Sequence, residues 1–292
     1  MVNFEKESFL KSAASGANFI PLARSWPADL ETPLTTWLKI GQAKPPGVLL
    51  ESVEGGETVG RWSVVASEPL WTARAFGDRL IRNWRDGRID EASGNPFQVL
   101  RDWLAPYKPS CLPNLPPLGQ LYGMWGYELI KWIEPTVPVN EHLAKDCPDG
   151  VWMLMDSILI FDQVKRVITA VAYGDLTEEQ SEEIALKRAI ERIQDLEKKM
   201  SAPLPAIKPL RWNSEQKTAL KTSSNFSKSE FEEAVQIAKE YIASGDVFQL
   251  VLSQRLETQV DHDPFDLYRS LRMVNPSPYM AFFDFGDWQL IG

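Results

Sequence analysis

The stretch Gly47-Val-Leu-Leu-Glu-Ser-Val53 decides which class of fold the sequence indicates. Together with Arg61-Trp-Ser-Val-Val65 it makes two short runs rich in aliphatic and aromatic residues, a composition typical of strands. Gly55 and Gly56, between the runs, suit a tight turn. We therefore predict an antiparallel hairpin.

The hairpin pattern recurs along the chain. Trp71–Phe76 and Arg79–Trp84 flank a second turn signal, and a further pair of strands is predicted at about residues 151–161 and 165–173. Residues 48–105 as a whole are predicted to form an antiparallel meander. Repeated hairpins of this kind indicate antiparallel rather than parallel sheets.

Two capping boxes predict where the long helices begin. Thr177-Glu-Glu-Gln180 precedes a charged amphipathic segment that we expect to be helical as far as Met200. Ser227-Lys-Ser-Glu230 opens a second helix, which Gly245 should end. Between the helices, residues 201–225 contain several prolines among polar residues, which predicts an exposed linker.

The linker divides the chain into a predicted first domain, residues 1–200, and the start of a second domain, residues 226–292. In the second part, residues 247–256 have the period-two pattern of a strand, with Gln249 on the polar face. A final hairpin turns at Gly286-Asp287. Because its last strand would need further sheet neighbours, we expect the chain to be a fragment.

The overall charge narrows the classes of partner. The formal net charge of −9 and the pI near 5.0 oppose binding to nucleic acid or to an anionic membrane. The amino terminus lacks the basic and apolar regions of a secretory leader, and the longest apolar stretch is interrupted by Asp156 and Ser157. We expect a cytoplasmic protein whose partners are small molecules or proteins.

Cysteine and histidine are too sparse to predict a disulfide framework or a metal site. Cys111 and Cys147 form no CxxC spacing, and His142 and His262 fit no metal-binding pattern. We therefore assign no metal ligand within residues 1–292.

Several strings of sequence resemble one enzyme family. Leu49-Leu-Glu-Ser-Val-Glu-Gly-Gly-Glu57, followed by Gly60-Arg-Trp-Ser63, resembles the amino-terminal signature of anthranilate synthase component I. Gly245-Asp-Val-Phe-Gln-Leu-Val-Leu-Ser-Gln-Arg255 and Asn275-Pro-Ser-Pro-Tyr-Met280 are similar to the first part of that family's chorismate-utilising domain. One departure is Gly123-Met-Trp-Gly-Tyr-Glu128, where relatives often read Gly-Tyr-Phe-Gly-Tyr-Asp.

The resemblance implies an α+β fold in which antiparallel sheets pack in a sandwich with flanking helices. It also implies a lyase of tryptophan biosynthesis that binds chorismate with Mg²⁺, adds ammonia to the ring and eliminates pyruvate to leave anthranilate. A glutamine amidotransferase subunit would supply the ammonia. The family's magnesium ligands and acid-base residues are expected beyond Gly292, so we expect residues 1–292 to be inactive alone.

The resemblance also implies a regulatory site, formed by the segments that match the family's motifs. The Leu-Leu-Glu-Ser and Asn-Pro-Ser-Pro-Tyr-Met segments are implied to form the pocket for feedback inhibition by L-tryptophan. The residues assigned to this ligand are Ser52, Pro278, Tyr279 and Met280, with Glu51 and Asn275 nearby. A prolyl carbonyl can accept from an ammonium, a hydroxyl can bond a carboxylate, and methionine and aromatic side chains suit an indole.

Gln249 is assigned to the active-site face of its strand. In related enzymes that add water, a lysine at the matching place can act as a general base, whereas a neutral amide cannot take a proton. Gln249 therefore favours ammonia as the nucleophile. A hydrogen bond within the sheet is the alternative explanation.

Other functions remain open at this stage. Aminodeoxychorismate synthase component I, of the folate pathway, aminates chorismate but keeps the pyruvyl group. Tyr279-Met280 favours anthranilate synthase, because those relatives usually carry Phe and a small residue there. For residues 1–292 by themselves, a non-catalytic tryptophan-binding module or a purely structural role is also possible.

Overall fold

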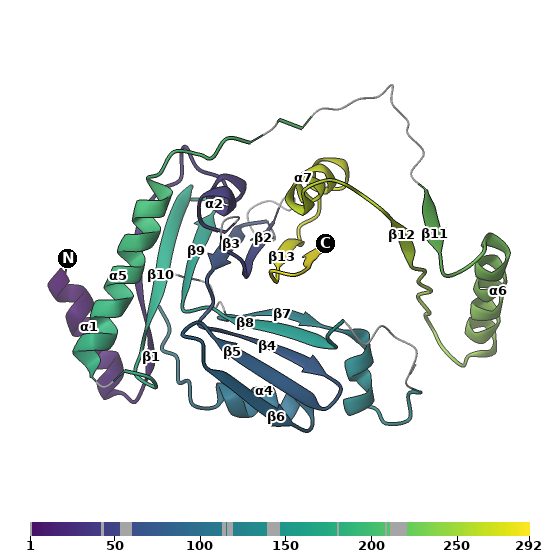
Figure 1. The fold of residues 1–292 in the computed structure, drawn as a ribbon, viewed down its shortest axis with the longest axis horizontal. Coiled ribbons are helices and arrows are strands. Elements are labelled where there is room, and N and C mark those ends of the chain that lie inside the picture. The colour runs from purple at the N-terminus through teal and green to yellow at the C-terminus, as the bar shows by residue number, and fades with distance from the viewer. Residues whose placement is uncertain are drawn as a thin grey trace. The chain divides into compact units, whose positions relative to one another are not determined.

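The computed structural model describes residues 2–41, 44–52, 60–112, 115, 119–138, 147–179, 181–207, 209–210 and 221–292. The chain falls into two compact units (Figure 1). The first contains Met1–Ile207 and Tyr268–Gly292, and the second contains Lys208–Leu267.

The first unit is built on two antiparallel sheets (Figure 1). Among the described residues, one sheet has seven strands in the order β1-β10-β9-β3-β2-β13-β14, and the other has five in the order β6-β5-β4-β8-β7. The strands of the larger sheet are β1 (Phe19–Pro27), β10 (Val167–Asp175), β9 (Ser157–Asp162), β3 (Trp62–Ser67), β2 (Gly47–Glu51), β13 (Met280–Asp284) and β14 (Gln289–Ile291). Those of the smaller sheet are β6 (Ile89–Ser93), β5 (Arg79–Trp84), β4 (Trp71–Phe76), β8 (Gly150–Leu154) and β7 (Leu121–Trp125).

The predicted hairpin pairings are confirmed. Strand β2 pairs antiparallel with β3, and β4 pairs antiparallel with β5. The turn predicted at Gly55-Gly56 lies outside the described residues. The last hairpin, β13 with β14, also pairs as expected.

The main core lies between the two sheets. Side chains alternate along a strand, so Val48 of β2, Val64 of β3 and Ile160 of β9 point to one side of the larger sheet. They share a buried cluster with Tyr122 of β7 and Met153 of β8, which belong to the smaller sheet. This packing confirms the predicted α+β sandwich of antiparallel sheets.

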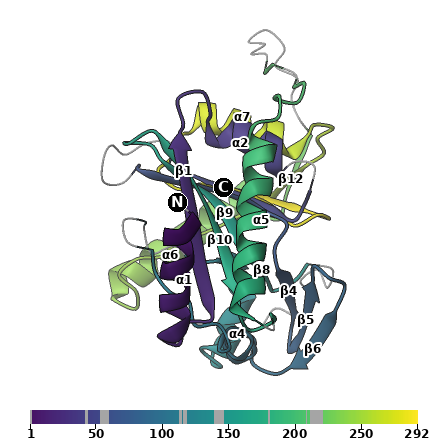
Figure 2. The same ribbon diagram turned by 90° about the vertical axis from the view of Figure 1, so that its left-hand side faces the viewer.

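Helices cover the outer face of the larger sheet. Helix α5 (Glu182–Met200) buries Ala185, Ala189 and Ile193 and packs against β10. Helix α1 (Val2–Ala14) lies beside α5, and α2 (Pro33–Ile40) packs on β2 and β3 (Figure 2). These are the flanking helices of the predicted architecture.

The predicted start of the α5 helix was wrong by several residues. Ser181 is the N-cap, and its hydroxyl accepts from the Ile184 N–H at 3.3 Å. Thr177 does not cap, because its hydroxyl donates to the Asp175 carboxylate at 2.6 Å. A capping box is a local pattern, and here a neighbouring carboxylate competes for the hydroxyl.

The single strand predicted at residues 151–161 is two strands. Strand β8 ends at Leu154 in the smaller sheet, and β9 begins at Ser157 in the larger sheet. Asp156, between them, is only 3% exposed. An apolar run predicts a strand but does not show which sheet each half will join.

The predicted meander over residues 48–105 ends in a helix. Helix α4 (Pro96–Leu104) begins at an Asn95 cap, whose side-chain oxygen accepts from the Phe97 N–H at 2.9 Å. It places Leu100 in a second buried cluster with Trp71 and Trp152, on the outer face of the smaller sheet. The short 3-10 helix η1 (Tyr127–Trp132) contributes Leu129 to the same cluster.

The second unit contains β11 (Thr222–Ser224), α6 (Lys228–Ser244) and β12 (Leu256–Thr258). The capping box that opens α6 is confirmed, and Gly245 ends the helix with a φ of 85°. The strand predicted over residues 247–256 was wrong, because only Leu256 of that range belongs to a strand. A strand needs a partner along its length, and β12 pairs only with the three residues of β11.

Helix α7 (Pro264–Val274) leads from Pro264 into β13 and β14. Residues 226–292, predicted to start a second domain, are therefore divided between the two compact units. The proposed domain boundaries at residues 200 and 226 remain predictions.

Candidate functional site

Two segments far apart in sequence lie side by side where β2 pairs with β13. In this antiparallel register Met280 is opposite Glu51, and Phe282 is opposite Leu49. Opposed residues point to the same face of a sheet. The pairing joins the Leu-Leu-Glu-Ser segment to the Asn-Pro-Ser-Pro-Tyr-Met segment within the first unit.

A hydrogen bond ties the two segments together just past the end of β2. The Ser52 hydroxyl donates to the Pro278 carbonyl at 2.9 Å, across 226 residues of sequence. The Ser52 N–H points to the Ser63 hydroxyl at 3.4 Å. The Tyr279 N–H donates to the Ser277 hydroxyl at 3.2 Å, which shapes the turn into β13.

Glu51 is a buried carboxylate held by α7. It is 4% exposed, accepts from the Tyr268 hydroxyl at 2.7 Å, and lies 3.2 Å from Arg272 Nε. Tyr268 and Arg272 are four residues apart, so one face of α7 presents both to the same carboxylate. The network fixes α7 against β2 on the face of the sheet away from the other sheet.

Burial sets the protonation of this network. Desolvation raises the pKa of Glu51 above its usual value, although the Tyr268 hydrogen bond and the charge of Arg272 lower it in part. Burial and the neighbouring Glu51 charge raise the pKa of Tyr268, which therefore keeps its proton and donates it.

The residues predicted to bind tryptophan differ in how far they are buried. Glu51 and Met280 are buried, whereas the Tyr279 side chain is 80% exposed and Asn275 is exposed. Tyr279 and Asn275 precede β13, in the segment between α7 and that strand. The strand pairing and the Ser52 hydrogen bond bring together Glu51, Ser52, Pro278 and Met280, whereas Tyr279 and Asn275 are exposed.

Tyr268 and Arg272 were not predicted as site residues from the sequence. They precede the Asn-Pro-Ser-Pro segment on a helix, and their four-residue spacing could have indicated a shared polar partner. The partner itself could not be identified, because Glu51 lies 217 residues from Tyr268.

Gln249 belongs to the second unit, where it is exposed and outside any strand. The polar strand face on which its assignment depended is absent from the described residues 247–255. Its role at an active site remains a prediction.

The described residues contain no group of three or more His, Cys, Asp or Glu side chains that could hold a metal ion. His142 lies outside the described residues. In the part of the chain that the structure describes, no helix has both the length and the apolar character needed to cross a membrane.

In this antiparallel sandwich α7 holds the buried carboxylate at the end of β2, and the Ser52 hydroxyl just past β2 donates to the segment before β13. Residues 48–292 match the family model for the chorismate binding enzyme, and the chain belongs to that family.

Several proteins to which the chain is similar are anthranilate synthase components. The chain is 47% identical over 291 residues to anthranilate synthase component 1 of Synechocystis sp., a match that covers 98% of the chain and 57% of the relative. It is 36% identical to that of Pseudomonas aeruginosa, covering 98% and 58%. The crystal structure of anthranilate synthase component I from Streptococcus pneumoniae superposes with a TM-score of 0.61 at 27% identity, covering 90% of the chain and 55% of that structure. The chain thus spans a little over half the length of these relatives.

Proposed function

We propose that this protein is the large subunit of an anthranilate synthase, which converts chorismate and ammonia to anthranilate and pyruvate. Membership of the chorismate binding enzyme family supports the substrate. The 47% identity along nearly the whole chain supports the particular reaction. Ammonia would come from a glutamine amidotransferase partner. The neutral amide of Gln249 fits this choice, because it cannot take a proton from water as a lysine can.

The chemistry proposed for the whole protein has two parts. Ammonia adds to the chorismate ring and the ring hydroxyl leaves as water. The enolpyruvyl group is then eliminated as pyruvate, with protonation of its methylene carbon and loss of a ring proton, which makes the ring aromatic. Magnesium would supply Lewis-acid stabilisation of the substrate carboxylate. In this proposal its ligands lie outside residues 1–292.

The junction of β2 and β13 is proposed as the site at which L-tryptophan inhibits the enzyme. The observation that carries this proposal is the Ser52 to Pro278 hydrogen bond of 2.9 Å. The hydroxyl suits the ligand's carboxylate, and the carbonyl suits its ammonium. A ligand would therefore replace one internal hydrogen bond by two charge-assisted bonds, which are stronger.

Glu51 is not proposed to bind the ammonium directly. Its carboxylate is already engaged by Tyr268 and Arg272. Its proposed part is to hold α7, and with it the Pro278 carbonyl, next to Ser52. The exposed ring of Tyr279, which directly follows Pro278, is proposed to cover the indole of the ligand.

Calorimetry with L-tryptophan tests the regulatory site on the chain itself. Ser52→Ala should weaken binding by about tenfold, the usual effect of losing a hydrogen bond to a charged group. Ser93→Ala is the matched control, because Ser93 is an exposed strand hydroxyl in the other sheet. Equal binding by Ser52→Ala and the parent chain would remove Ser52 from the site.

Genetic complementation tests the activity and separates it from the alternatives. The full-length gene that contains the coding sequence for these residues should support growth of a tryptophan auxotroph that lacks anthranilate synthase component 1. It should not support a strain that requires 4-aminobenzoate. The opposite result would indicate aminodeoxychorismate synthase, and tryptophan binding without growth of either strain would indicate a non-catalytic module.

A further inference from the structure

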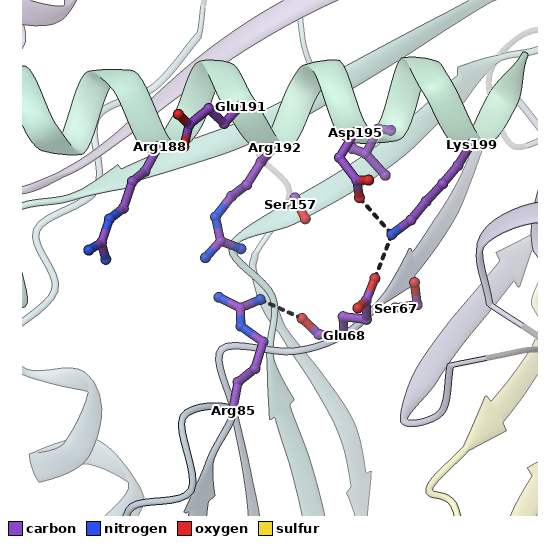
Figure 3. Close-up of a pocket in the computed structure, with 10 residues that line it drawn as sticks. Ser67, Glu68, Arg85, Ser157, Arg188, Glu191, Arg192, Asp195 and Lys199 are labelled. Atoms are coloured by element: carbon purple, nitrogen blue, oxygen red, sulfur yellow. Dashed lines mark hydrogen bonds and ion pairs between the residues drawn. The ribbon is translucent and has the colours of Figure 1, made fainter.

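One face of α5 carries a row of charged side chains over a cavity. Arg188, Arg192, Asp195 and Lys199 follow helical spacing, so they project from the same side. Arg85, after the end of β5, reaches toward them from the smaller sheet (Figure 3). The cavity that they line has a volume of about 370 Å³.

At the Lys199 end of this cavity, positive and negative side chains pair with one another. Lys199 Nζ lies 2.6 Å from Glu68 Oε2 and 2.7 Å from Asp195 Oδ2 (Figure 3). The other oxygen of Glu68 lies 3.0 Å from Lys44 Nζ. Two ammonium groups therefore match two carboxylates.

Three arginines lie together at the other end of the cavity. Arg85 donates to Asp156 at 2.5 and 3.2 Å, and Arg192 forms an ion pair with the same carboxylate. Two guanidinium groups thus share one carboxylate. Arg188 pairs with Glu179, and Asp175 is a further carboxylate near Arg192.

The guanidinium groups retain donors that are directed into the cavity. Arg192 and Arg188 each use Nη1 in their ion pairs with described residues, and a guanidinium has five N–H donors. Burial and the nearby charges of Arg85 and Arg188 lower the pKa of Arg192, although Asp156 and Asp175 oppose the shift. The group stays protonated, and a further anion beside it would relieve the repulsion between the arginines.

The same three arginines also border a second cavity, of about 510 Å³. Asp175 borders that second cavity, where the Thr177 N–H and hydroxyl donate to its carboxylate. The first cavity has four cationic wall residues, Arg85, Arg188, Arg192 and Lys199, and three anionic ones, Glu68, Glu191 and Asp195.

We propose that Arg188 and Arg192, with Arg85, bind a small oxyanion in this cavity, through phosphate or carboxylate groups. Guanidinium groups form paired, charge-assisted hydrogen bonds with either kind of anion. This site is separate from the junction of β2 and β13, and the proposal does not depend on the anthranilate synthase assignment.

The test measures the thermal unfolding of the full chain in inorganic phosphate, against sodium chloride at equal ionic strength. We expect phosphate to raise the unfolding temperature in a saturable way. Arg188→Gln should weaken the fitted phosphate affinity by about tenfold, because one charge-assisted contact is lost. Lys187→Gln is the matched control: it removes the same charge one residue away, from a side chain that is 75% exposed and does not line the cavity.

Arg188 is chosen because it does not contact Asp156, so its loss leaves the buried carboxylate paired. Unfolding in chloride alone checks that the variant keeps the parent stability. Succinate in place of phosphate distinguishes the two kinds of anion, and tighter binding of either one supports the site. The proposal is overturned if neither anion stabilises more than chloride, or if Lys187→Gln weakens binding as much as Arg188→Gln.

Discussion

Glu51 holds α7 in place and also makes the stability of the fold depend on pH. Its carboxylate is buried, and the hydrogen bond from Tyr268 compensates only part of the cost of removing the charge from water. The pKa is raised in the folded protein, so the native state binds a proton more readily than the unfolded chain. Stability from this group must therefore increase as the pH falls.

This sign can be measured with Glu51→Gln, which replaces the carboxyl by a neutral amide of the same shape. The free energy of unfolding of the parent, relative to the variant, should rise as the pH is lowered from 7 toward 4.5, the usual pKa of a glutamate. Urea denaturation at several pH values gives the difference, and other carboxylates cancel in it. A difference that falls with decreasing pH would show that Glu51 is instead stabilised in its charged form.

Of the two long helices with predicted capping boxes, α5 is the one whose start was predicted wrongly. The Ser181 hydroxyl accepts a hydrogen bond from the Ile184 N–H, whereas the Thr177 hydroxyl donates to the Asp175 carboxylate. Both residues carry a hydroxyl and precede the helix, so the local sequence pattern does not show which of them is the N-cap. What decides between them is the position of Asp175, which ends strand β10.

A substitution at the cap tests this assignment. Ser181→Ala should lower the free energy of unfolding by about 1 kcal/mol, the usual cost of losing an N-cap hydroxyl. Ser181→Asn should restore most of the stability, because asparagine caps equally well. Chemical denaturation monitored by circular dichroism would compare the three proteins. If alanine and serine are equivalent at residue 181, the cap is elsewhere.

At the scale of the whole first unit, Asp156 links parts that belong to different layers. It sits where the chain passes from the smaller sheet to the larger one, and it binds Arg85 after β5 and Arg192 on α5. Removing one partner of a buried ion pair costs more than the pair itself contributes, because the remaining charges stay desolvated.

Asp156→Ala should therefore destabilise the protein by about 2 kcal/mol, less than for fully buried pairs since both guanidinium groups are partly exposed. Asp195→Ala is the control, because Asp195 is 56% exposed and its partner Lys199 also pairs with Glu68. Equilibrium denaturation should show a much smaller change for the control. Equal effects at residues 156 and 195 would contradict a linking role for Asp156.

Local features of the chain were predictable to the extent that they depend on neighbours in sequence. The hairpin of Trp71–Phe76 with Arg79–Trp84 follows from its turn glycine and its β-branched residues. The α6 helix follows from the capping box at Ser227 and from Gly245 at its end. The strand predicted at residues 247–256 was wrong, because an extended segment requires a partner strand and the periodicity of a segment does not show whether one is available.

The sequence by itself determined the class of the fold, the family, and the two segments that carry the candidate site. Tertiary structure alone decided that these segments pair, that Ser52 and Pro278 bond to each other, and that Tyr268 and Arg272 hold Glu51. The physical reason is range: helix caps and turns are satisfied within a few residues, whereas burial and charge pairing depend on which distant surfaces meet.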